Sequence, residues 1–112
     1  MSADGDARAL EHMIGAARSI LSAMKGKKRA FAKDTVLQDA VIRRFEIMGE
    51  AARRLSRTFM EAHPDVPWKR IIGLRNFLIH AYDKVRVDEV LQVVEDTLPH
   101  VVRQLEALRT NG

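Results

Sequence analysis

Apolar residues recur along most of this chain at spacings of three and four, the period of one face of an α-helix. One such row lies within residues 6–25 and a second within residues 35–62, where a proline follows. Gly26 is placed to end the first helix, and Thr35 with Gln38 reads as a capping box for the second. The two rows consist of Leu10, Met13, Ile14, Ala17, Leu21 and Met24, and of Leu37, Val41, Phe45, Met48, Ala52, Leu55 and Phe59.

Two further helices are predicted after that proline. The third covers about residues 65–82, with Pro67 tolerated in its first turn, and the fourth begins at Asp88 as its N-cap. Pro99 should kink the fourth helix, because proline has no N–H to donate to the carbonyl of Glu95. The apolar residues are Ile71, Ile72, Leu74, Leu78 and Ile79 in the third helix, and Val87, Leu91, Val94, Leu98, Val101, Leu105 and Leu108 in the fourth.

The sequence contains no alternating strand pattern, no glycine-rich phosphate loop and no internal repeat. Four helices or slightly more, joined by short connections, predict an all-α fold, an antiparallel bundle of four to five helices with a C-terminal helix kinked at Pro99. A length of 112 residues fits a single domain spanning residues 1–112. A chain this short buries a limited share of its surface, so association with a partner would help it.

Composition narrows the chemistry. The absence of cysteine excludes disulfides and thiolate metal sites, and the four histidines form no H-x-x-x-H pair, so we expect neither a metal nor a cofactor. The acidic N-terminus lacks the features of a signal peptide and no apolar run is long enough to span a membrane, which favours a cytoplasmic protein. A net charge of +4 permits nucleic-acid binding, and the cations that would attract RNA cluster at Lys25, Lys27, Lys28, Arg29 and Lys33.

Polar side chains interrupt the otherwise apolar third helix. At about 100° per residue, Asn76 and His80 share one face, while Arg75 and Tyr82 share an adjoining face. Arg75 and His80 are about 140° apart, so their convergence needs the reach of the arginine, a loosened helix end or a second subunit. An ordinary helix end, with a satisfied histidine and a half-buried tyrosine, is the alternative interpretation.

Four segments in order resemble the HepT-like branch of the HEPN superfamily, over about residues 8–108. Its R-N-x-x-x-H-x-Y pattern is matched by Arg75, Asn76, His80 and Tyr82. Residues 40–43 and 46–52 resemble its A-x-x-R and E-x-x-G-E-A signature, residues 64–76 its P-x-x-P-W and G-x-R-N segment, and residues 98–99 its Leu-Pro pair. The family's asparagine ahead of E-x-x-G-E-A is Arg44 here, and the basic cluster has no counterpart in the pattern.

The resemblance implies the toxin of a type VII-like toxin–antitoxin pair, a metal-independent endoribonuclease that works as a homodimer with both motif helices lining one cleft. It also implies a cognate minimal nucleotidyltransferase (MNT-type) antitoxin, which would silence the toxin by AMPylation of Tyr82. A shared cleft would let Arg75 and His80 act across the two-fold axis.

The residue types suit RNA cleavage without a metal, because the 2′-OH of RNA is an internal nucleophile. His80 can transfer protons near neutral pH, and Arg75 can stabilise charge on the phosphorus oxygens. Asn76 could orient the imidazole or bind a phosphate oxygen, and Tyr82 could also position RNA.

Two other functions stay open. The first is a non-catalytic helical module that binds a nucleotidyltransferase and presents substrate or nucleotide to it. The second is a general basic nucleic-acid binder, whose affinity would follow the Lys25–Arg29 cluster and ignore His80. Other polar positions are expected to be structural, with Glu50 pairing with Arg53 or Arg54 on a helix surface.

Overall fold

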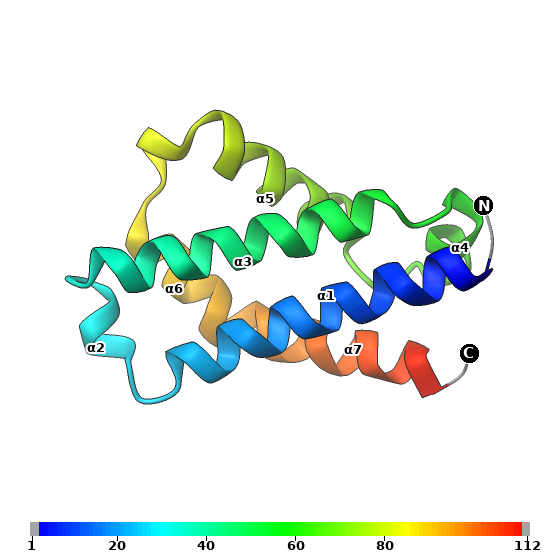
Figure 1. The fold of residues 1–112 in the computed structure, drawn as a ribbon, viewed down its shortest axis with the longest axis horizontal. Coiled ribbons are helices and arrows are strands. Elements are labelled where there is room, and N and C mark those ends of the chain that lie inside the picture. Colours follow the sequence, from blue (N-terminus) through cyan, green and yellow to red (C-terminus); the bar gives the residue numbers. More distant parts are fainter. Residues whose placement is uncertain (1–2, 111–112) are drawn as a thin grey trace.

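Four long helical segments form the body of the computed structural model, which describes residues 3–110 (Figure 1). They are α1 (Ala3–Met24), α3 (Thr35–Arg53), α5 (Trp68–His80) and a last segment that joins α6 (Val87–Gln92), η2 (Val93–Thr97) and α7 (Leu98–Thr110). Three short helices lie between them, α2 (Lys28–Phe31), α4 (Arg57–Ala62) and η1 (Tyr82–Lys84). Residues 3–110 contain no strand, which confirms the prediction of an all-α bundle.

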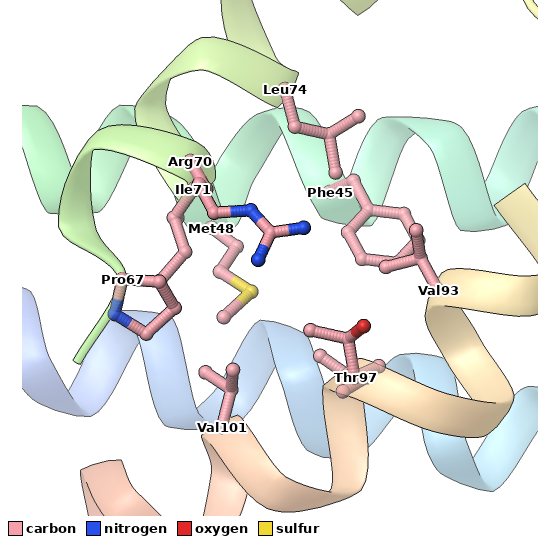
Figure 2. Close-up of a pocket in the computed structure, with 10 residues that line it drawn as sticks. Phe45, Met48, Pro67, Arg70, Ile71, Leu74, Val93, Thr97 and Val101 are labelled. Carbon is pink, nitrogen blue, oxygen red and sulfur yellow. The ribbon is translucent and has the colours of Figure 1, made fainter. Parts of the chain in front are cut away.

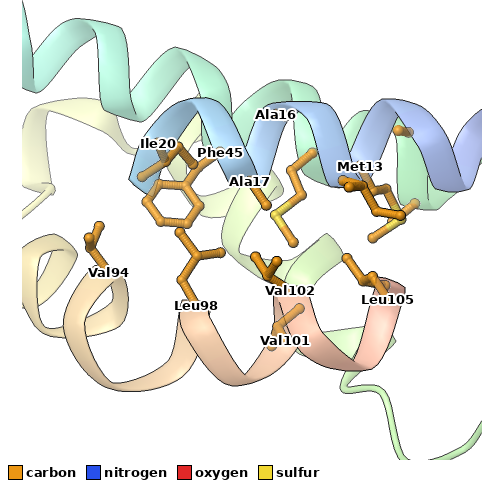
Figure 3. Packing of buried hydrophobic residues seen from close by; sticks show 14 of the residues in the cluster. Met13, Ala16, Ala17, Ile20, Phe45, Val94, Leu98, Val101, Val102 and Leu105 are labelled. Carbon is orange, nitrogen blue, oxygen red and sulfur yellow. The ribbon is translucent and has the colours of Figure 1, made fainter. Parts of the chain in front are cut away.

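The core lies where α1 packs against both α3 and α7. Figure 3 shows Met13 and Ile20 of α1 facing Leu98 and Leu105 of α7, with Phe45 of α3 nearby. Each of these side chains is buried, and burial of a large apolar side chain contributes about 1.5–3 kcal/mol. Most of the apolar residues in the rows found in the sequence therefore join one core, whereas Ile79 of the third row is exposed.

The prediction of one helix over residues 35–62 is wrong, because the chain breaks between α3 and α4. Ser56 is the N-cap of α4, and its Oγ accepts a hydrogen bond from the N–H of Phe59 at 3.0 Å. The N–H and hydroxyl of Ser56 both donate to the carboxylate of Asp6, each at 2.7 Å. Asp6 lies in α1, so a contact between distant parts of the chain stabilises the break.

Helix starts also differ from the predictions. Asp34, rather than Thr35, caps α3, since its Oδ1 accepts from the N–H of Leu37 at 3.0 Å. Gln38 does not complete a capping box, because its Nε2 donates to the carbonyl of Phe31 at 2.7 Å. Asp88 lies inside α6, whose N-cap is Arg86, and Pro67 is the N-cap of α5 rather than part of its first turn.

The helix end predicted at Gly26 is present, and the last helix is irregular on the N-terminal side of Pro99. Gly26, with φ of +71°, follows α1 in the left-handed conformation that glycine adopts most easily. The last helix departs from regular α geometry just before Pro99, where η2 is a π-helix and the N–H of Leu98 donates to the carbonyl of Val93. No helix within residues 3–110 is long and apolar enough to cross a membrane.

Candidate active site

Arg75 extends from α5 toward α3 and is held there. Its Nη2 lies 2.9 Å from Oε2 of Glu50, and its Nη1 donates to Oδ1 of Asn76 at 2.8 Å. The side chain is only 17% exposed, and its Nε–H is buried without a partner among the described residues. A guanidinium with two nitrogens engaged and one N–H unsatisfied retains capacity for a further acceptor.

Gly49 is what allows this close approach. A Cβ built on Gly49 would lie 2.2 Å from the Cβ of Arg75 and 3.1 Å from the carbonyl oxygen of Ile71. Only glycine therefore fits between the two helices at this level. Gly49 is the glycine of the E-x-x-G-E-A segment, so that segment was the one sign in the sequence that two helices approach closely here.

Glu50 has a partner that sequence reasoning missed. The predicted pair with Arg53 is present, at 3.4 Å, but the pair with Arg75 is shorter and crosses between helices. The predicted pair with Arg54 does not form, because Arg54 instead lies 3.1 Å from Nδ1 of His12 in α1. Arginine has only donors, so this contact requires Nδ1 of the imidazole to act as the acceptor.

His80 and Asn76 lie on the exposed side of α5, away from buried Leu78. Because α5 remains a regular helix to His80, the separation of about 140° from Arg75 persists, and the helix end is not loosened early. No side-chain hydrogen bond joins His80 to Arg75 or Asn76 within residues 3–110. One chain thus brings Arg75 and Asn76 together but leaves His80 apart.

Tyr82 does not continue the helix. α5 ends at His80, its C-cap Ala81 has φ of −136° and ψ of 35°, and Tyr82 begins η1. The idea that Arg75 and Tyr82 share a helix face assumed an unbroken helix, and the structure contradicts it.

The predicted RNA-attracting cations lie around α2, at the same end of the bundle as the C-terminus of α5 (Figure 1). All five side chains are exposed. Lys28 pairs with Glu95 at 2.8 Å, and this hydrogen bond, together with the attraction of the charge, raises the pKa of Lys28. The other cations of the cluster (Lys25, Lys27, Arg29 and Lys33) form no ion pair with any described residue.

Two hollows lie on different sides of α5. One, of about 440 Å³, opens between α3 and α5 beside Arg75. The other, of about 330 Å³, is mostly apolar and lies between α5 and the helices η2 and α7, with Arg70 pointing toward its middle (Figure 2). The apolar cavity contains none of the predicted site residues and no proton-transfer group.

No group of three or more histidine, aspartate or glutamate side chains within the described residues could hold a metal ion.

Comparison with known proteins agrees with the resemblance. The family model described as "Ribonuclease HepT-like" matches residues 10–108. "Putative RNase TTE0752" of Caldanaerobacter subterraneus subsp. tengcongensis is 35% identical over 88% of this chain and 89% of its own length. "Putative RNase MJ1380" of Methanocaldococcus jannaschii is 38% identical over 68% of this chain and 70% of its own length.

A further relative, "Probable ribonuclease HepT" of Thermococcus cleftensis, is 38% identical over 70% of this chain and 72% of its own length. No solved structure matches the chain. The family match covers nearly all of the chain and includes the arginine and histidine of α5. The chain belongs to the HepT-like ribonuclease family.

Proposed function

We propose that this protein is the toxin of a type VII-like toxin–antitoxin pair and acts as a metal-independent endoribonuclease. One observation carries the proposal. In a member of the HepT-like family, α5 presents a guanidinium fixed by Glu50 and, five residues later, an exposed imidazole. These are the two groups that RNA cleavage without a metal requires, a charge that stabilises phosphate and a group that transfers protons.

In the proposed reaction, the 2′-oxygen of RNA forms a bond to the adjacent phosphorus and the bond from phosphorus to the 5′-oxygen breaks. His80 accepts the proton of the 2′-OH or donates one to the leaving 5′-oxygen, and water exchanges the other proton. Arg75 stabilises the negative charge of the phosphorane, and Asn76 keeps the guanidinium oriented through its Oδ1. The products are a 2′,3′-cyclic phosphate and a 5′-hydroxyl.

A homodimer would bring Arg75 of one chain to His80 of the other. Within one chain the two side chains point about 140° apart on a regular helix, so a second copy is the simplest way to unite them. Phe77, which is 45% exposed, lies about 60° from His80 around α5 and is an apolar side chain that an interface would cover.

Mixed dimers test the shared site. We expect Arg75→Ala and His80→Ala each to be inactive alone, and an equal mixture, after subunit exchange, to regain about a quarter of wild-type activity. Half of the dimers would then be mixed, each with one intact site. No recovery after confirmed exchange would place both groups in one chain.

The ribonuclease itself is tested on labelled RNA in the presence of a chelator. We expect cyclic-phosphate products, a loss of activity in His80→Ala, and normal activity in His100→Ala, whose exposed imidazole lies in α7. Cleavage that survives in His80→Ala, or that the chelator abolishes, would refute the mechanism.

The proposed antitoxin is an MNT-type nucleotidyltransferase that transfers AMP from ATP to the hydroxyl of Tyr82 and releases pyrophosphate. The position of this residue supports the role, since Tyr82 begins η1 after Ala81, the C-cap of the motif helix. Mass spectrometry after co-expression should find AMP on Tyr82 and none on a Tyr82→Phe variant.

A non-catalytic module that presents substrate to a nucleotidyltransferase is the second candidate, because Arg75 and His80 do not meet within one chain. Expression of the chain alone separates the two functions. A toxin arrests growth, and Arg75→Ala or His80→Ala relieves the arrest, whereas a presenting module causes no arrest.

A further inference from the structure

The hollow between α3 and α5 has the size and the polar groups of a ligand site. Its volume of about 440 Å³ falls in the range of small-molecule pockets. Arg75 forms part of its wall, so a ligand there would lie beside the proposed phosphate-binding group. Its lining residues are Arg43, Glu46, Ile47, Glu50, Arg54, Arg75 and Ile79.

The lining combines an aliphatic surface with both donors and acceptors. Ile47 and Ile79 supply apolar area that a flat ring can cover, while arginines and glutamates supply hydrogen bonds at the edge. The hollow is lined by three arginines and two glutamates, and Arg43 and Arg75 already pair with Glu46 and Glu50, so little positive charge is left for a second phosphate. A neutral nucleobase, with an apolar face and a polar edge, suits this lining better than a second phosphate does.

Glu46 is the most informative group of the hollow. Its side chain is only 19% exposed, and its Oε1 pairs with Nη1 of Arg43 at 3.2 Å. No hydrogen bond to its Oε2 is found among residues 3–110. An unpaired carboxylate oxygen can accept hydrogen bonds from a ligand in the hollow, and Arg43 beside it offers N–H groups to a neighbouring acceptor.

We propose that this hollow binds a guanine base of the RNA, next to the phosphate held by Arg75. Guanine presents two adjacent donors, N1–H and the N2 amino group, to the carboxylate of Glu46, and its O6 accepts from Arg43. The location beside a cut phosphate rests on the proposed ribonuclease function. The base preference rests on the hollow alone.

The other bases fit this donor and acceptor pattern less well. Adenine would place the acceptor N1 against the carboxylate of Glu46. Uracil has a single N–H between two carbonyl oxygens that the carboxylate would repel, and cytosine offers one amino group beside the acceptor N3. Guanine alone satisfies both Glu46 and Arg43 with one edge.

Nucleotide binding to the full chain tests the base preference without any catalysis. We expect 3′-GMP to bind about tenfold more tightly than 3′-AMP, 3′-CMP or 3′-UMP in calorimetric titrations. Glu46→Gln should lose most of this preference, since an amide offers one acceptor where the carboxylate offers two. Glu61→Gln, in an exposed position on α4, is the matched control and should keep the preference.

Equal binding of the four nucleotides, tighter binding of 3′-AMP, or an unchanged preference in Glu46→Gln would each overturn the proposal. Circular dichroism of Glu46→Gln confirms that the variant is folded. Nucleotide binding and RNA cleavage are measured on the same protein, so the guanine site and the ribonuclease activity can fail separately. Preferential binding of 3′-GMP without RNA cleavage would contradict the ribonuclease and leave the guanine site standing. RNA cleavage with equal binding of the four nucleotides would support the ribonuclease and contradict the guanine site.

Discussion

Replacing Gly49 by alanine should force α5 away from α3. The added methyl would lie 2.2 Å from Cβ of Arg75, more than about 1 Å inside normal carbon–carbon contact. It would also lie 3.1 Å from the carbonyl oxygen of Ile71, which belongs to the backbone and cannot rotate aside. Both atoms belong to α5, so the whole helix must shift.

The expected cost follows from two opposing effects. Overpacking in a close-packed interior typically costs about 1–3 kcal/mol. Alanine in a helix interior is favoured over glycine by about 0.8–1 kcal/mol. A contact of 2.2 Å is severe, so the overpacking cost falls in the upper part of its range, about 2–3 kcal/mol. The net expectation for Gly49→Ala is then a loss of about 1–2 kcal/mol in the free energy of unfolding, together with a weakened pair between Glu50 and Arg75.

Urea unfolding followed by circular dichroism measures this loss. Gly15→Ala and Gly73→Ala are matched controls, because a Cβ at either position meets nothing within 4 Å in residues 3–110. Both controls should be as stable as the wild type or more so, by up to about 1 kcal/mol. A Gly49→Ala protein at least as stable as these controls would refute the close-approach argument.

Further measurements test the local structure. Ser56→Ala should lower stability by about 1–2 kcal/mol in urea unfolding, because it removes the cap of α4 and a hydrogen bond to α1. Asp34→Ala should cost about 1 kcal/mol while Thr35→Ala costs little, and the reverse order would restore the predicted capping box. The raised pKa of Lys28 means that its pair with Glu95 stabilises the fold below the normal pKa of 10.5 and is lost as pH rises through the raised value. Stability followed from pH 9 upward should therefore fall less in Lys28→Met than in the wild type.

Local patterns predicted most of the helices but not the break at Ser56. The apolar row continues through Leu55 and Phe59, so its period gives no sign of an interruption. The break depends on Asp6, fifty residues earlier, whose carboxylate accepts two hydrogen bonds from Ser56. The spacing of apolar residues reports only on neighbours within a helix, so it cannot predict a helix break that depends on a residue so far along the chain.

In the candidate site, too, local spacing was predictable from the sequence and contacts between helices were not. The spacing of Arg75, Asn76 and His80 could be found by inspection, and so could their angular separation on a helix. That Glu50 would hold Arg75 could not, because nearer arginines compete for the same carboxylate in the sequence. Only the packing of α5 on α3 decides between them.

By itself, then, the sequence determined that the chain is helical, most of the residues that face the core, and that Arg75, Asn76 and His80 share one helix. These properties depend on hydrogen bonds within a helix and on burial of one face, and both repeat with the helix period. The tertiary structure alone decided that Gly49 admits α5 closely enough for Glu50 to reach Arg75, and that His80 remains exposed on the other side. Such contacts join residues far apart in the chain, so they arise only when whole helices pack.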